Sequence, residues 1–184
     1  RRREFGMEKP CADCRVVIHF TPRSGSSWLS SLMESSGFLG TGFELFNPNF
    51  ISNIARNFGA RSLEEYIDLA HRYSARKGVL SFEVTSHQLL AVFRNPKDFF
   101  QVFEGARSIW LIREDIVLQA VSLAKMVRLG ISHTPNTTPE DRSRSEGIFD
   151  YSQKEIERWL NHILVAERNT EALLNAHKIA PLRL

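Results

Sequence analysis

The chain has 184 residues, of which 42% are hydrophobic and 24% are charged, which is ordinary for a globular domain with a real core. Its formal net charge of +3 is compatible with an anionic ligand. A charge this small, without a basic stripe that carries interleaved aromatic residues, argues against nucleic acid as a partner. No apolar run approaches the roughly 20 residues of a membrane-spanning helix, so no transmembrane segment is predicted.

Two cysteines, Cys11 and Cys14, form a lone C-x-x-C pair ahead of the first predicted strand. A zinc site needs further ligands, and a thioredoxin-like motif follows a strand at the start of a helix. We therefore interpret both side chains as reduced thiols on a surface segment. This use of cysteine favours a cytoplasmic protein, and the sequence suggests no metal site.

Apolar runs rich in β-branched and aromatic residues alternate with helical patterns along the chain. The predicted strands are 15–20, 79–85 and 108–112. The predicted helices are 28–36, 62–76, 86–93, 97–103, 115–129 and 152–177. This alternation predicts one α/β domain over residues 1–184, in which helices flank a central, mainly parallel sheet.

Two further segments lie outside this alternation. Residues 130–150 are polar, contain two prolines and show no periodicity, which predicts a mobile loop able to act as a lid. The last four residues, PLRL, have the pattern of a beginning strand. We therefore expect the natural domain to continue past Leu184.

The first predicted strand ends in the short loop TPRSGSS (21–27), and a helical pattern follows at once. Such a unit directs unpaired backbone N–H groups and the positive end of a helix dipole toward a ligand. Gly25 permits close approach of an anion, the serines add hydroxyl donors, and Arg23 adds a planar fork suited to phosphate or sulfate. The loop lacks the Lys of G-x-x-x-x-G-K-[ST], so it favours an anionic nucleotide that is not used as ATP. The alternative is a serine-rich βα turn without a ligand.

A second strand–turn–helix unit follows later in the chain. Arg113 comes at the carboxyl end of strand 108–112, where parallel sheets bind ligands, and Asp115 suits a helix N-cap. Ser122 lies on the following helix. Two interpretations stay open: Arg113 and Ser122 bind a second phosphate, or Arg113 pairs with a neighbouring carboxylate while Ser122 is a small packing residue.

Two phosphate-type sites without a Lys for ATP chemistry resemble those of sulfotransferases that use PAPS (3′-phosphoadenosine 5′-phosphosulfate). More narrowly, the chain resembles the bacterial trehalose-type sulfotransferase family, which includes lipopolysaccharide and nodulation-factor sulfotransferases. The matching stretches are TPRSGSSWL (21–29), GFELF (42–46), GVLSFEVTSHQL (78–89) and GARSIWLIREDIVLQAVSLAKM (105–126). The most specific is R-E-D-x-x-x-Q-A-V-S, from Arg113 to Ser122.

This resemblance implies a P-loop-like nucleotide-binding sulfotransferase fold and transfer of a sulfuryl group from PAPS to a hydroxyl of a carbohydrate or glycolipid acceptor. It needs no metal, and it allows a homodimer because some members pair. The residues it assigns to the cofactor are Arg23, Ser24, Gly25, Ser26, Ser27, Trp28, Arg113 and Ser122. Glu44 matches the family's proposed general base and would meet the acceptor. Phe46, close to Glu44, either forms part of an apolar wall for the acceptor or anchors the loop in the core. Arg23 would also act in catalysis by stabilising the developing negative charge.

The chain departs from the family pattern most clearly at Glu83, and residues 130–133 also lack a Trp that is common there. Many members carry Lys where this chain has Glu83, and replacing a cation by an anion changes the local electrostatics. Three interpretations of Glu83 stay open: its side chain faces solvent, it serves as an alternative base, or it binds a cationic acceptor. Two other functions stay open: a catalytically degenerate nucleotide-binding or scaffold protein, and a P-loop nucleotide kinase. The missing Lys and the lack of a strand-end Asp for Mg²⁺ count against the kinase.

Overall fold

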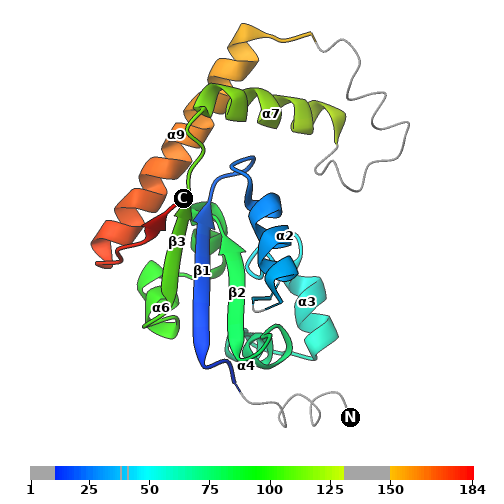
Figure 1. Ribbon diagram of the computed structural model, residues 1–184, viewed down its shortest axis with the longest axis vertical. Helices are drawn as coiled ribbons and strands as arrows, with labels where there is room; N and C mark the ends of the chain where they lie inside the picture. The colour runs from blue at the N-terminus through cyan, green and yellow to red at the C-terminus, as the bar shows by residue number, and fades with distance from the viewer. Residues whose placement is uncertain (1–10, 38, 41, 131–149) are drawn as a thin grey trace.

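The computed structural model describes residues 11–37, 39–40, 42–130 and 150–184. Its centre is a sheet of four parallel strands in the order β2-β1-β3-β4 (Figure 1). The strands are β1 (Cys14–Phe20), β2 (Val79–Val84), β3 (Arg107–Leu111) and β4 (Leu182–Arg183). The predicted α/β architecture is confirmed, and the predicted final strand pairs with β3.

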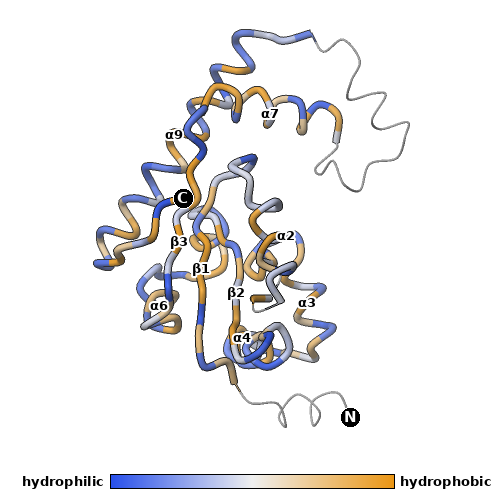
Figure 2. The backbone as a smooth tube through the Cα atoms, viewed as in Figure 1, coloured by the Kyte–Doolittle hydropathy of each residue, from blue (hydrophilic) through white to orange (hydrophobic). Residues whose placement is uncertain are grey.

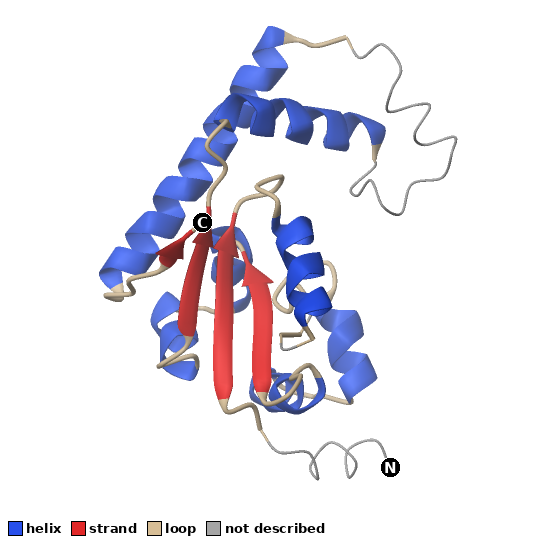
Figure 3. Ribbon diagram, viewed as in Figure 1, coloured by secondary structure: helices blue, strands red, loops and turns tan. Residues whose placement is uncertain are grey.

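Helices flank this sheet on both faces (Figure 3). They are α2 (Ser26–Ser36), α3 (Ile51–Phe58), α4 (Leu63–Tyr73), α5 (Ser86–Val92), α6 (Pro96–Val102), α7 (Ile116–Leu129) and α9 (Gln153–Ala176). The sequence predicted all of them except α3. The predicted loop 130–150 lies outside the described residues apart from its two ends, Gly130 and Asp150.

Side-chain caps explain where several helices begin. The Thr85 hydroxyl accepts from the Gln88 N–H and the Gln88 side chain accepts from the Thr85 N–H, a capping box at the start of α5. Asn95 caps α6 one residue before Pro96, which needs no N–H at the first helical position. Asp115 caps α7 by accepting from the Leu118 N–H at 2.8 Å, as predicted.

The two faces of the sheet carry different cores. Val16 and Ile18 of β1 pack against Met33 of α2 on one face. The other face holds an aromatic core over β2, α4, α5 and α6, with Phe46 and Phe82 fully buried within it. Figure 2 shows the apolar stretches of β1 that serve these cores. Because α2 begins six residues after the end of β1, its first turn lies at the carboxyl edge of the sheet.

Helices α7 and α9 pack against each other; α7 lies beyond the carboxyl ends of the strands, and α9 runs from there back beside the sheet toward β4 (Figure 1). Their shared apolar cluster is built on Ala120, Leu123 and Ile163, all buried. Helix α9 also reaches α5, where the Ser86 hydroxyl donates to the Ala166 carbonyl at 3.3 Å. Within the described ranges, no helix has the length and apolar character needed to cross a membrane.

Candidate functional site

The loop Thr21–Ser27 continues β1 into α2 at the carboxyl edge of the sheet. Its backbone takes positive φ at Arg23 (68°) and Gly25 (104°). Glycine adopts this conformation freely, whereas a side-chain-bearing residue such as Arg23 is strained there by about 1–2 kcal/mol. Gly25 is the N-cap of α2 and has no side chain that could cap the first-turn N–H groups. We name residues 23–27 the phosphate cradle after the ligand that the sequence predicts for them; a positive-φ loop at an uncapped helix N-terminus has the features that such a site needs.

Three residues from the two predicted half-sites meet beside this loop. The Arg23 Nε donates to the Ser122 Oγ at 2.8 Å, and the Arg113 Nη1 donates to the Arg23 carbonyl at 3.3 Å. Burial and the neighbouring Arg113 cation lower the pKa of Arg23. A partly desolvated cation with a second cation beside it gains from an anionic partner. The loop after β1 and the helix after β3 therefore form one continuous cationic site.

Gln119 is the residue of this site that the sequence interpretation missed. Its side chain is fully buried, and its Nε2 donates to the Thr21 Oγ1 and to the Pro22 carbonyl, both at 2.9 Å. Gln119 and Ser122 are three positions apart on α7 and so share the face that meets the loop. That spacing, together with a polar residue in an otherwise apolar stretch, was the signal available in the sequence.

The other cradle residues differ in how they face a ligand. The Ser24 Oγ is buried and has no hydrogen-bond partner among the residues that the structure describes. Ser26 is buried and hydrogen-bonds the Glu83 carboxyl, whereas Ser27 is exposed. Trp28 is 70% exposed on the first turn of α2. A buried hydroxyl and an exposed indole thus flank the backbone N–H groups of the loop.

Glu44 lies in a loop that runs alongside β2. Phe43 forms an isolated parallel bridge with Phe82, and its carbonyl accepts from the Glu83 N–H at 3.0 Å. The Glu44 Oε2 accepts from the Asn47 Nδ2 at 2.7 Å and from the Gln88 Nε2 at 2.5 Å. Two amide groups therefore orient one oxygen of this carboxylate.

The aromatic residues around Glu44 have unequal roles. Phe46 is 1% exposed and packs edge-on against Tyr66, Phe82 and Phe93 in the core. The loop turns the Phe46 ring inward, where it fills the space above the sheet, so its burial favours the role of a core anchor over contact with an acceptor. Phe43, in contrast, is 58% exposed.

Glu83 does not face solvent. It is 4% exposed on β2, and its Oε1 lies 2.5 Å from the Ser30 Oγ of α2. Its pKa is raised to about 6, mainly by burial and to a smaller extent by the Glu44 charge, while hydrogen bonds from Ser30 and Ser26 offset part of the rise. Glu83 therefore lies between the phosphate cradle and the loop that carries Glu44.

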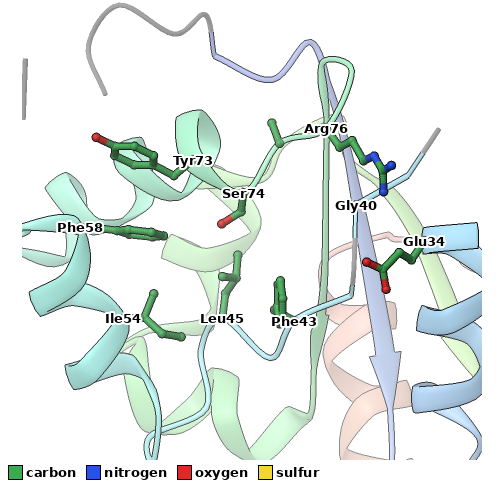
Figure 4. Close-up of a pocket in the computed structure, with 10 residues that line it drawn as sticks. Glu34, Gly40, Phe43, Leu45, Ile54, Phe58, Tyr73, Ser74 and Arg76 are labelled. Atoms are coloured by element: carbon green, nitrogen blue, oxygen red, sulfur yellow. The ribbon is translucent and has the colours of Figure 1, made fainter. Parts of the chain in front are cut away.

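A separate cleft of about 480 Å³ lies near the amino end of β2, away from the cradle (Figure 4). Its lining is mainly apolar and aromatic, with charged groups at the edge. The lining residues are Glu34, Gly40, Phe43, Leu45, Ile54, Phe58, Tyr73, Ser74, Ala75 and Arg76. Since nucleotides bind at the carboxyl ends of parallel strands, this cleft is distinct from the phosphate-type site.

Comparison with known proteins does not identify a family for this chain. No protein-family model matches the chain, and no curated protein matches it. In the part of the chain that the structure describes, no group of three or more His, Cys, Asp or Glu side chains is placed to hold a metal ion. The geometry of Arg23, Arg113 and Ser122 is therefore the main basis for a functional proposal.

Proposed function

We propose that this chain is a PAPS-dependent sulfotransferase with a P-loop-like nucleotide-binding fold, which transfers a sulfuryl group to a hydroxyl of a carbohydrate or glycolipid acceptor. The observation that carries the proposal is the joining of Arg23, Ser122 and Arg113 at the carboxyl ends of the neighbouring strands β1 and β3. Two guanidinium groups and a hydroxyl suit a nucleotide with phosphates at two positions.

Each end of the nucleotide has its own partners in this proposal. The 5′-phosphosulfate occupies the cradle of residues 23–27, where backbone N–H groups, the Ser24 hydroxyl and the Arg23 guanidinium are donors. Arg113 and Ser122 bind the 3′-phosphate. Trp28, exposed on the first turn of α2, contributes a flat apolar surface next to the cradle.

The chemistry assigned to the site is an in-line displacement at sulfur. The Glu44 carboxylate takes the proton of the acceptor hydroxyl as the new oxygen–sulfur bond forms and the bond to the 5′-phosphate breaks. Adenosine 3′,5′-bisphosphate leaves with the negative charge, which Arg23 and the cradle N–H groups stabilise. Asn47 and Gln88 hold one oxygen of Glu44, which leaves its other oxygen for the acceptor.

A nucleotide-binding protein without transfer activity is the second candidate. Glu83, a buried acid beside the cradle, favours it because an anion there opposes a phosphosulfate group. Both candidates bind the nucleotide, and only the sulfotransferase turns PAPS over with a carbohydrate acceptor. The nucleotide kinase is less favoured, because residues 21–27 contain no Lys.

A calorimetric titration of the whole chain tests the shared binding claim. Adenosine 3′,5′-bisphosphate is compared with ADP and with ATP in the presence of magnesium. The proposal expects tight binding only of the nucleotide with a 3′-phosphate. A preference for ATP with magnesium, or no binding by the folded chain, contradicts it.

A further inference from the structure

Glu83 is a buried acid that the proposed reaction does not use. It lies on β2 opposite Ile18 of β1, and its side chain is on the sheet face that α2 covers. Its carboxyl group hydrogen-bonds the Ser30 hydroxyl at 2.5 Å and the Ser26 hydroxyl as well. Because Ser26 belongs to the phosphate cradle, Glu83 directly contacts a residue that would meet an anion bound there.

When Glu83 is ionised, the single proton of the Ser30 hydroxyl has two acceptors within reach. The Ser30 Oγ lies 2.5 Å from the Glu83 Oε1 and 3.3 Å from the Gly42 carbonyl oxygen. A hydroxyl has a single proton, while an ionised carboxylate and a carbonyl are both acceptors. A protonated Glu83 removes this conflict, since it donates to Ser30 and Ser30 donates to Gly42.

The loop that carries Glu44 is packed directly on this pair. A Cβ at Gly42 would lie 2.6 Å from the Ser30 Oγ and 3.1 Å from the Glu83 Oε1, so any larger residue would displace these two side chains. The Glu83 N–H also donates to the Phe43 carbonyl. Both the backbone and the side chain of Glu83 therefore fix the two residues that precede Glu44.

The groups facing Glu83 make its protonation sensitive to charge. From α2 come the hydroxyls of Ser26 and Ser30, from β1 comes Ile18, and from the loop comes the Glu44 carboxylate. Burial already brings the pKa of Glu83 to about 6. An anion arriving in the cradle adds negative charge beside it and raises that pKa further.

We propose that Glu83 is a positioning residue that couples the two halves of the site: a phosphorylated nucleotide entering the cradle drives proton uptake by Glu83, which completes the hydrogen-bond chain from Glu83 through Ser30 to the Glu44 loop. This inference rests on the proposed function. Linkage requires that nucleotide affinity falls as Glu83 ionises, between about pH 6 and pH 8.

The test is calorimetry of adenosine 3′,5′-bisphosphate binding at pH 6, 7 and 8, in buffers of differing ionisation enthalpy. Glu83→Gln keeps a donor toward Ser30 and cannot titrate. Glu34→Gln removes the same charge from an exposed position on α2 and is the matched control. We expect wild type and Glu34→Gln to take up more protons on binding than Glu83→Gln does. From pH 6 to pH 8 they should also lose about two- to fivefold more affinity than Glu83→Gln, which corresponds to a rise of about half to one unit from a pKa of about 6. The nucleotide's own titration cancels in this comparison.

The outcomes separate the two proposals. Binding with the same proton uptake and the same pH dependence in Glu83→Gln and wild type overturns the coupling and leaves the nucleotide site standing. No binding to wild type overturns the proposed function and the coupling with it. If Glu83→Gln fails to fold, carbon-13 NMR of the Glu83 carboxyl in the wild-type chain decides the question. Its titration midpoint must move to higher pH with adenosine 3′,5′-bisphosphate, and an unmoved midpoint overturns the coupling.

Discussion

Replacement of Gln119 by Met should make the phosphate cradle less ordered without leaving a cavity in the core. The substitution keeps the length of the side chain and removes the two hydrogen bonds from the Nε2 to the Thr21 hydroxyl and the Pro22 carbonyl. Each such bond contributes about 1 kcal/mol, so the free energy of unfolding should fall by about 2 kcal/mol. The loop residue next in the chain is Arg23, whose strained backbone depends on its neighbours being held.

The binding consequence follows from that loss of order. If the nucleotide must order one released loop residue, at about 1–2 kcal/mol, affinity for adenosine 3′,5′-bisphosphate falls roughly 5- to 30-fold. Urea denaturation and calorimetry measure the two effects. Thr170→Val is the control, because its buried hydroxyl bonds the Ala166 carbonyl within α9, far from the cradle. A destabilised Gln119→Met that binds the nucleotide as tightly as wild type would refute the reasoning.

Three further predictions concern the cradle, the base and the core. Gly25→Ala should weaken nucleotide binding and lower the free energy of unfolding by about 1–2 kcal/mol; the cost comes from its φ of 104° alone, since no atom lies within 4 Å of the added Cβ. The control Gly59→Ala, at φ 77°, should lose stability but not nucleotide affinity. Equal losses of affinity in the two variants would count against the cradle. Glu44→Gln should lower PAPS turnover with carbohydrate acceptors by roughly 10²–10⁴-fold while nucleotide affinity stays the same, and unchanged turnover would exclude Glu44 as the base. Burial lowers the pKa of His19 to about 4, so the free energy of unfolding of wild type should fall by up to about 3 kcal/mol between pH 6.5 and pH 4, as the unfolded chain gains a proton that the folded chain does not. The free energy of unfolding of His19→Phe should fall less, and parallel curves of stability against pH would contradict this.

The sequence predicted the strands and most helices because their patterns are local. Buried parallel strands appear as short β-branched runs, and Asp115 provides a cap that can be read from residue type alone. The missed helix α3 also has a signal: Ile51, Ile54, Ala55 and Phe58 follow helical spacing and pack on the core.

The contacts within the candidate site were harder to predict because they depend on strand order. Arg23 meets Ser122 because β1 and β3 are neighbours in the sheet, and no local pattern specifies that pairing. The burial of Phe46 likewise follows from the way its loop crosses the aromatic core. The place of Glu83 between two functional segments required the position of α2 as well as of β2.

The most direct test of the central claim asks whether Arg113 recognises a 3′-phosphate. The dissociation constants of adenosine 3′,5′-bisphosphate and adenosine 5′-monophosphate are measured for wild type, for Arg113→Ala and for Arg94→Ala, an exposed arginine that controls for net charge. A hydrogen-bonded charge contributes about 1.5–3 kcal/mol, so wild type and Arg94→Ala should prefer the bisphosphate by roughly 10- to 150-fold. Arg113→Ala should lose most of that preference, with only a small loss of affinity for the monophosphate, because its bond to the Arg23 carbonyl is lost as well. A preference that survives in Arg113→Ala, or an equal loss for both nucleotides, would contradict the account.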